Sequence, residues 1–405
     1  MHLAIIGTGK MGTAVFQWAV DRDVALTLCS RSEENLRQQE GRFLRKLERA
    51  ARRGAITAGQ AEARKASVRF TTRIADIAGA DFALESAPES LEVKVPVLRA
   101  MEDAAGPDAF VLSNTSFISL DRLAQALRRP DRFCGLHFFY PVMVIPLVEI
   151  ITWRGLAAGA SGRLLELCGV LGRPGIVVSD GPGSPLNWIL ACLYFEGLYL
   201  LEEGAALPDR IDEVARRYFS PGPCEAMDTL GIEFILQGLH MFTMSMNAQP
   251  LDWLRNDATE LPPGKAGGRS GFHVPWLFGH LQQANRFGRR VSRGLFVYEG
   301  DKTLNDEPSY YLRPGTTAHP LADDEIAARL FYTVLNAALH SLSRRLGSPE
   351  DLDHGLKEVL LMQAGPLQIA RTFGAAKVRR DFAELESKYG RRFHPCLPLE
   401  DIGLT

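Results

Sequence analysis

A glycine-rich segment near the start of the chain is the first pattern that can do chemistry. It has the spacing G-x-G-x-x-G over Gly7, Gly9, Lys10, Met11 and Gly12. A short apolar run precedes it and a helical pattern follows. In that context the glycines let the backbone approach a pyrophosphate at a helix N-terminus. We predict that this loop binds a dinucleotide, with a tight turn in another doubly wound protein as the alternative.

The end of the second expected strand bears on the choice between NAD and NADP. In NAD enzymes a carboxylate there accepts hydrogen bonds from the ribose 2′-hydroxyl. Here the strand ends in Ser30 and Arg31, and Asp23 stands at its other end. A guanidinium can pair with a 2′-phosphate and lie against the adenine. We therefore expect NAD or NADP, with NADP slightly favoured, unless Arg31 points into solvent.

Four polar residues occur in distinctive contexts. They are Ser116 in Ser-Asn-Thr-Ser, His137 in Gly-Leu-His-Phe-Phe-Tyr-Pro, Glu149 in Pro-Leu-Val-Glu-Ile, and Asn187 in Gly-Pro-Gly-Ser-Pro-Leu-Asn. A single histidine at a strand end is more often a hydrogen-bonded core residue than a base. The order and separations of all four, however, resemble the 3-hydroxyacyl-CoA dehydrogenase family over nearly the whole chain.

The resemblance implies roles that the chemistry also requires. Oxidation of a secondary alcohol needs a base at the hydroxyl, and histidine titrates near neutral pH. His137 is implied as that base, with Glu149 on its other ring nitrogen to fix the tautomer. Ser116 and Asn187 are implied to hold the substrate oxygens. Because Asn187 lies beyond the sheet domain, we expect the site in a cleft between domains.

Further positions match the family more weakly. Glu89 and Lys94 are implied to lie near the nicotinamide half of the cofactor, and Arg290 to reach the same cofactor. Lys46 and Arg53 match a helical arm that touches the thioester carrier. For each of these residues, an ordinary surface charge is the alternative.

Three residues depart from the family pattern. Tyr140 replaces the asparagine of His-Phe-Phe-Asn-Pro, beside cofactor and substrate. Ser30 stands where NAD enzymes have an acid. Ala328 replaces Asn187 in a second helical block, so we expect only one active site.

The elements that position these residues follow from apolar periodicity. In the first 180 residues short apolar runs alternate with helical patterns, which predicts a parallel sheet with helices on both faces. The expected strands are 3–7, 24–29, 68–71, 82–85, 110–113, 133–137 and 176–178. A helical stretch at 33–65 carries a basic run, which is either a solvated face or an anion-binding surface. Its members are Arg42, Arg45, Lys46, Arg49, Arg52 and Arg53.

Beyond residue 182 the pattern becomes helical and repeats. Residues 198–212 match residues 339–353 at a constant offset, with similar Gly-Pro pairs farther on, which indicates a duplication. We expect long connections at 248–320. The fold class is therefore α/β: a Rossmann-like, mostly parallel sheet domain over 1–182, followed by all-α domains from a duplicated helical unit at 183–300 and 301–405.

Composition narrows the partners. The net charge of −2 over 405 residues argues against nucleic acid, the six cysteines lack metal-ligand spacing, and no apolar run approaches a membrane span. Because the first strand begins at residue 2, we expect a cytoplasmic protein. A helical domain duplicated within one chain allows a monomer or a homodimer.

The function we predict is interconversion of an (S)-3-hydroxyacyl thioester and its 3-ketoacyl form with NAD(P) in fatty acid metabolism, on CoA or an acyl carrier protein. One alternative is a related NADP-dependent reductase or dehydrogenase of a biosynthetic pathway that acts on a carrier-bound acyl chain or a free hydroxy acid. The other is a nucleotide-binding scaffold without catalysis.

Overall fold

The computed structural model describes residues 1–181, 183–236, 238, 274–300, 302–396, 399 and 403. The chain divides into two compact units, Met1–Ser184 and Pro185–Thr405. The boundary falls close to the predicted end of the sheet domain at 182. The predicted division of the helical part at 300 stays a prediction.

The first unit is built on one eight-stranded sheet in the order β3-β2-β1-β4-β5-β6-β7-β8. The strands are β1 His2–Ile6, β2 Ala25–Cys29, β3 Val68–Thr71, β4 Phe82–Glu85, β5 Phe110–Ser113, β6 Phe133–Phe138, β7 Val148–Thr152 and β8 Gly175–Ser179. All neighbours pair in parallel except β6 and β7. This arrangement confirms the predicted Rossmann-like, mostly parallel fold.

The seven predicted strands are all present, but the prediction missed β7. Its sequence, Val-Glu-Ile-Ile-Thr, places a carboxylate inside a short apolar run. Apolar periodicity alone does not identify such a segment as a buried strand, because an isolated buried charge is costly. The tertiary structure supplies the missing partner, since Glu149 pairs across the sheet with His137.

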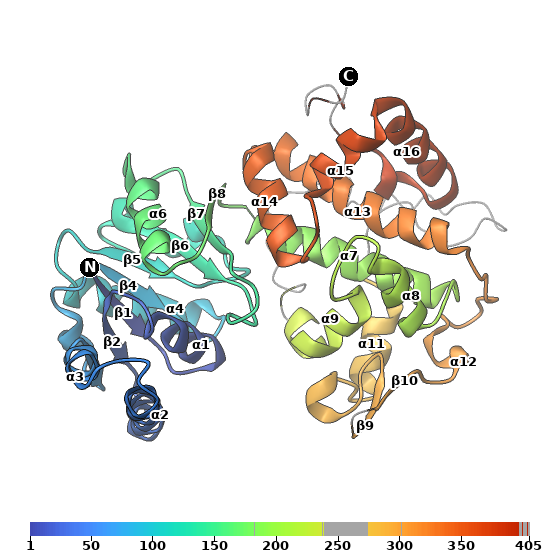
Figure 1. Ribbon diagram of the computed structural model, residues 1–405. Helices are drawn as coiled ribbons and strands as arrows, with labels where there is room; N and C mark the ends of the chain where they lie inside the picture. Colours follow the sequence, from blue (N-terminus) through green and yellow to red (C-terminus); the bar gives the residue numbers. More distant parts are fainter. Residues whose placement is uncertain are drawn as a thin grey trace. The chain divides into compact units, whose positions relative to one another are not determined.

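Helices cover both faces of this sheet (Figure 1). They are α1 Lys10–Ala19, α2 Glu33–Arg52, α3 Ala58–Ala66, α4 Leu91–Ala104, α5 Leu120–Ala124 and α6 Ala160–Val170. Residues of α1, α2 and α6 share one core with the strands. From β4 onward the strands are added on the other side of β1, so the right-handed crossover through α4 lies on the opposite face of the sheet. The predicted stretch at 33–65 is two helices, because Thr57 starts α3 with a capping box to Gln60.

The second unit is helical and contains the predicted repeat. Its main helices are α7 Pro185–Glu202, α8 Pro208–Ala215, α9 Pro223–Leu230, α13 Asp323–Ser343, α14 Pro349–Val359, α15 Pro366–Phe373 and α16 Ala375–Tyr389. The series α7-α8-α9 corresponds to α13-α14-α15. In both, a carboxylate accepts two backbone N–H groups at the start of the third helix: Asp212 at 2.9 and 2.8 Å, and Asp353 at 2.7 and 3.0 Å.

The predicted long connection at 248–320 is only partly correct. Residues 239–273 lie outside the described residues. The described part of the segment contains α11 Trp276–Gln283, the antiparallel hairpin β9 Val297–Glu299 and β10 Lys302–Leu304, and α12 Pro308–Tyr311. The second unit is therefore not purely helical. None of its described helices, nor any of the first unit, is long and apolar enough to cross a membrane.

Candidate active site

The glycine loop joins β1 to α1 at the carboxyl edge of the sheet. Gly7 has φ +121°, and a Cβ there would lie 2.5 Å from the carbonyl oxygen of Ser86. A Cβ on Gly12 would lie 2.2 Å from the carbonyl oxygen of Gly7. Internal packing therefore requires both glycines.

Gly9 differs from these two. Within the described part of the chain, no heavy atom beyond Gly9 and its two chain neighbours lies within 4 Å of the position of its Cβ, so the space beside Gly9 is open. Gly9 is also the N-cap of α1 and, having no side chain, does not cap the helix itself. An open cradle beside a helix N-terminus fits the pyrophosphate of a dinucleotide.

The end of β2 lies next to this loop. The hydroxyl oxygens of Ser30 and Thr8 are 2.7 Å apart, and Ser30 also accepts the N–H of Ser32 at 3.2 Å. Arg31 is exposed. Ser30 and Arg31 therefore lie beside the glycine loop, where the ribose of a bound dinucleotide would make its contacts with the protein.

His137 and Glu149 form a buried pair. They are register partners on the antiparallel strands β6 and β7, so their side chains share one face. The distance from Nδ1 of His137 to Oε2 of Glu149 is 2.7 Å, and the two side chains are 3% and 0% exposed. The carboxylate fixes the proton of a neutral imidazole on Nδ1, which leaves Nε2 as the acceptor nitrogen.

The acceptor nitrogen faces Ser116. Its hydroxyl oxygen lies 3.1 Å from Nε2 of His137, in the loop after β5. A nitrogen that can take a proton and a hydroxyl that can donate a hydrogen bond thus lie within one hydrogen bond of each other. This geometry suits general acid-base chemistry on a small oxygen-bearing group.

Ser184 completes the chain of contacts and was missed by the sequence analysis. Its hydroxyl donates a hydrogen bond to Oε2 of Glu149, and its backbone N–H donates to the carbonyl of Ser116 at 3.1 Å. The only sequence signal was its place in the Gly-Pro-Gly-Ser turn. Ser184 therefore holds both the carboxylate behind His137 and the loop in front of it.

Glu89 organises that same loop. Its Oε1 accepts the backbone N–H groups of Ser116 and Phe117 at 2.9 and 2.8 Å, and the hydroxyl of Thr115 at 2.6 Å. Burial alone raises the pKa of Glu89, but the ammonium of Lys94 and these hydrogen bonds outweigh it and hold the pKa below its ordinary value. The ionised carboxylate therefore fixes the position of Ser116.

Lys94 is buried rather than displayed to solvent. Its side chain is 1% exposed, with Nζ 2.8 Å from Glu85 and 3.2 Å from Glu89. Burial alone lowers the pKa of Lys94, but the two carboxylates outweigh it and hold the pKa above its ordinary value. Glu85 also accepts the hydroxyl of Ser113 at 2.6 Å. The sequence analysis missed Glu85 and Ser113, because both read as the ends of ordinary strands.

Tyr140 contacts the glycine loop. The ammonium of Lys10 lies 3.7 Å from the centroid of its ring, a cation–π distance. The residue that departs from the family asparagine is thus paired with a charged residue of the dinucleotide loop. The contact joins the segment after β6 to the start of α1.

The remaining predicted site residues are Lys46, Arg53, Asn187 and Arg290. Lys46 forms an ion pair with Asp21 at 2.5 Å, and Arg53 is exposed at the end of α2. Asn187 lies in the first turn of α7 and Arg290 pairs with Glu233 at 2.5 Å; both belong to the second unit, so their places in the site stay predictions.

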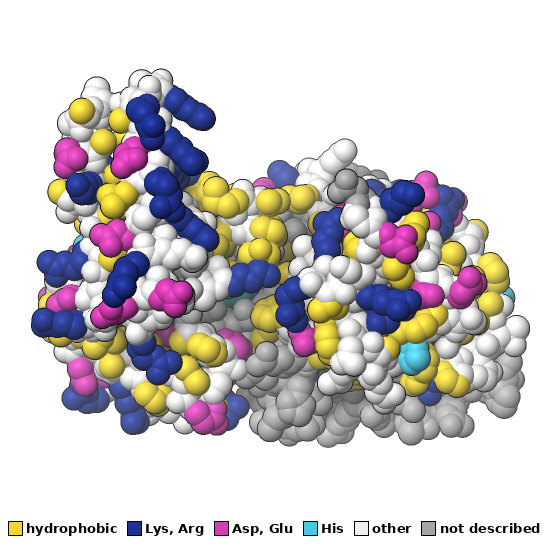
Figure 2. All heavy atoms as spheres, turned by 90° about the horizontal axis from the view of Figure 1, so that it is seen from below, with side chains coloured by type: hydrophobic (Ala, Val, Ile, Leu, Met, Phe, Trp, Pro, Cys, Tyr) yellow, Lys and Arg dark blue, Asp and Glu magenta, His cyan; other side chains and the backbone are white. Residues whose placement is uncertain are grey.

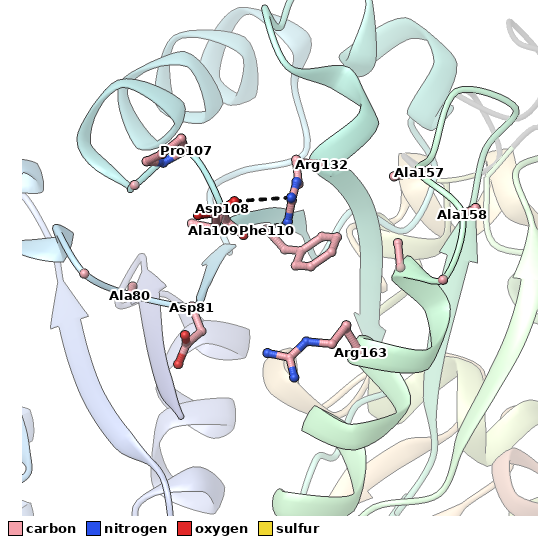
Figure 3. Close-up of a pocket in the computed structure, with 14 residues that line it drawn as sticks. Ala80, Asp81, Pro107, Asp108, Ala109, Phe110, Arg132, Ala157, Ala158 and Arg163 are labelled. Carbon is pink, nitrogen blue, oxygen red and sulfur yellow. Dashed lines mark hydrogen bonds and ion pairs between the residues drawn. The ribbon is translucent and has the colours of Figure 1, made fainter.

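A hollow of about 550 Å³ lies at the opposite, amino edge of the sheet. Figure 3 shows Arg132, Asp108, Asp81 and Arg163 around it. Arg132 donates to the carbonyl of Asp108 at 2.9 Å. Residues that line the hollow lie at the amino ends of β4, β5 and β6. Ligands of open α/β sheets instead bind beyond the carboxyl ends of the strands. The hollow is therefore separate from the candidate active site.

Comparison with known proteins gives consistent matches. Residues 2–181 match the family described as 3-hydroxyacyl-CoA dehydrogenase, NAD binding domain. The solved structure of 3-hydroxybutyryl-CoA dehydrogenase from Escherichia coli K12 aligns with a TM-score of 0.81 and 22% identity, over 99% of this chain and 98% of that one, which shows the fold. The (S)-3-hydroxybutyryl-CoA dehydrogenase from Ralstonia eutropha aligns with a TM-score of 0.61 and 25% identity, over 74% and 99%.

Curated relatives are longer than this chain. The fatty acid oxidation complex subunit alpha of Pseudomonas aeruginosa is 30% identical over 98% of this chain and 54% of its own length. The subunit of the same name from Shewanella amazonensis is 28% identical over the same shares. The chain thus spans about half the length of the curated relatives it matches.

Proposed function

Residues 2–181 belong to the NAD-binding domain family of the 3-hydroxyacyl-CoA dehydrogenases, and on this premise we propose that the chain interconverts an (S)-3-hydroxyacyl thioester and its 3-ketoacyl form. The observation that carries the proposal is the line of contacts from Ser116 through His137 to Glu149 at the carboxyl edge of the sheet. Oxidation of an alcohol needs a base, here His137, and a carboxylate that orients the base, here Glu149. It also needs a group that holds the substrate oxygen, here Ser116.

In the oxidation direction, Nε2 of His137 accepts the hydroxyl proton of the substrate. A nicotinamide dinucleotide held on the loop of Gly7, Gly9 and Gly12 would supply the acceptor for the hydride of the carbon that bears this hydroxyl. Glu149 stabilises the imidazolium that forms, and Ser184 keeps its carboxylate oriented. Ser116 donates a hydrogen bond to the substrate oxygen, so the reacting carbon stays aligned with the base.

Residues around this line hold it in place. Glu89, held by Lys94, anchors the loop of Ser116, so a contact of these two residues with the nicotinamide would be additional to that role. Roles of Asn187 toward the substrate and of Arg290 toward the cofactor stay predictions. Tyr140 and Lys10 line the same edge and shape it for the substrate. A cytoplasmic location and a monomer or homodimer stay predictions.

We infer further that the enzyme accepts NADPH at least as well as NADH. No carboxylate at the end of β2 repels a 2′-phosphate, and Arg31 is exposed beside the glycine loop. A guanidinium forms paired, charge-assisted hydrogen bonds to phosphate. Titration of both cofactors against wild type and Arg31→Ala tests this. We expect the NADPH to NADH affinity ratio to fall roughly tenfold or more in the variant, and an unchanged ratio would remove Arg31 from the proposal.

The activity itself is tested by following the absorbance of NADH or NADPH with acetoacetyl-CoA. Turnover supports the dehydrogenase. Turnover of free 3-keto acids, with CoA esters rejected, would favour a hydroxy acid dehydrogenase. Cofactor binding with no turnover of any 3-keto compound would favour a nucleotide-binding scaffold.

A further inference from the structure

A cation and an aromatic ring meet at the carboxyl edge of the sheet, outside the line from Ser116 to Glu149. The ammonium of Lys10, the first residue of α1, lies 3.7 Å from the centroid of the Tyr140 ring. Lys10 is exposed and Tyr140 is half-buried. Figure 2 shows a more usual environment for cations, because the Lys and Arg side chains of α2 form a basic row along a projecting arm. The ring of Tyr140 instead holds the ammonium of Lys10 in one place.

The contact spans a wide part of this edge. Lys10 follows β1 and Tyr140 follows β6, and β4 and β5 lie between these two strands in the sheet. Three strand spacings separate the ends of β1 and β6 by about 14 Å. The two side chains therefore meet over the ends of β4 and β5. A dinucleotide that extends from the glycine loop to His137 must cross the same ends, so the pair borders its path.

Charge selects the part of the dinucleotide that the pair serves. The N-terminus of a helix carries a partial positive charge, so a cation in the first turn is unfavourable there. Helix α1 nevertheless begins with Lys10 and has no acidic residue in its first turn. An anion beside this turn would compensate both positive charges. The pyrophosphate is the anionic group that NAD and NADP share, whereas a reduced nicotinamide and a keto group carry no charge.

The ring contributes position rather than charge. A lysine side chain that moves freely in solvent loses rotamer freedom when it binds an anion, and this loss offsets part of the attraction. A ring that already holds the ammonium removes part of that cost before the ligand arrives. The asparagine that the family has in place of Tyr140 offers no ring for such a contact.

We propose that Tyr140 is a positioning residue for the cofactor: its ring holds the ammonium of Lys10 beside the start of α1, where the ammonium binds the pyrophosphate. The inference rests on the dinucleotide site, which the family match of residues 2–181 supports, and not on the proposed reaction. It adds to any contact of Tyr140 with the substrate. Because both cofactors contain the pyrophosphate, the pair raises the affinity for NADH and NADPH alike and leaves their ratio to Arg31.

Binding titrations test the pair without turnover. The ligands are NADH, NADPH and ADP-ribose, which contains the pyrophosphate but no nicotinamide. We expect Lys10→Met to weaken all three roughly tenfold and Tyr140→Leu to weaken them about two- to fivefold. In the Lys10→Met background Tyr140→Leu should have little further effect, because the pair acts as a unit.

Two further variants are matched to these. Tyr140→Phe keeps the ring and should restore the affinity that Tyr140→Leu loses. Lys65→Met removes an exposed lysine of α3, in the same unit, and controls for the change in net charge.

Three outcomes would overturn the proposal. If ADP-ribose binds Lys10→Met as tightly as wild type, the ammonium does not bind the pyrophosphate. If Tyr140→Leu weakens NADH equally with and without Lys10, the ring does not act through the ammonium. If the variants raise only KM for acetoacetyl-CoA and leave the dissociation constants unchanged, the pair serves the thioester. If no thioester is turned over but the expected differences in binding are found, the proposed function fails and the role of Tyr140 stands.

Discussion

Each unit of the molecule contains a buried charge cluster, and the two clusters are built differently. In the helical unit Arg329 lies 2.5 Å from Glu196 and 2.5 Å from Glu203, and Arg392 lies 3.0 Å from Glu196. Burial alone raises the pKa of Glu196, but the two guanidinium groups outweigh it and hold the pKa below its ordinary value. Every charge there faces an opposite charge, so the cluster holds the two repeats together.

The cluster around His137 in the sheet unit is different. Glu149 faces one nitrogen of His137, and the other nitrogen faces the neutral hydroxyl of Ser116. Imidazole can exchange a proton through that second nitrogen, whereas a guanidinium cannot. A buried cluster thus becomes a candidate site when one of its members can change protonation toward a polar group. Burial and ion pairing alone do not make one.

The largest expected effect is on the sheet cluster. Replacement His137→Ala removes the base and should lower kcat by roughly 100-fold to 10,000-fold. Glu149→Gln, which keeps the shape but not the charge, should lose most turnover as well. Steady-state kinetics with acetoacetyl-CoA measures this, and cofactor affinity should stay within about twofold because neither residue is a principal dinucleotide anchor. Wild-type rates in both variants would refute the mechanism.

The second effect is on the helical cluster. Arg329→Met removes the guanidinium partner of Glu203 and leaves Glu196 with Arg392 alone, and it should lower the free energy of unfolding by about 3 to 5 kcal/mol. Denaturant titration measures it. The exposed pair of Arg163 and Glu166 provides the control, since Arg163→Met should cost less than about 1 kcal/mol. Equal losses at both sites would contradict the distinction drawn between buried and exposed pairs.

A third, smaller effect is a difference between the two helical repeats in how their contribution to the free energy of unfolding depends on pH. Burial raises the pKa of Asp212 to about 7, whereas in the unfolded chain it is near ~3.9. The native state therefore binds this proton more tightly, so the stability it contributes is present below pH ~4 and is lost as pH rises through 7.

Between pH 5 and 8 the free energy of unfolding of wild type should fall relative to that of Asp212→Asn by roughly 2 to 3 kcal/mol. Burial raises the pKa of Asp353 as well, but its side chain is less buried, so Asp353→Asn should change the pH profile less. Parallel profiles for wild type and Asp212→Asn would show that the native carboxyl is already ionised.

The smallest effect is expected at Ala328, where the second repeat has no side-chain amide. Ala328, the counterpart of Asn187, directly precedes Arg329, whose ion pairs pack the repeats. Ala328→Asn should therefore leave kcat/KM within about twofold and stability within about 0.5 kcal/mol. Asn187→Ala should instead lower kcat/KM with acetoacetyl-CoA. Loss of activity in Ala328→Asn would place the second repeat at the active site.

Much of the arrangement could be read from the sequence because its signals are local. The glycine spacing, the apolar runs of seven strands and the repeat around Asp212 and Asp353 each depend on neighbours close in the chain. His137 could be placed at a strand end for the same reason. Local patterns also identified the basic row of α2.

The tertiary structure decided the contacts that make the site. The antiparallel register of β6 and β7 puts Glu149 opposite His137, and a register between strands leaves no trace in either strand alone. The contact of Ser184 with Glu149 joins residues 35 positions apart. The pairing of Lys94 with Glu85 and Glu89 spans a shorter stretch, but it requires α4 to pack beside β4. Burying such charges is favourable only when their partners arrive together, so these contacts depend on the completed fold and not on any single segment.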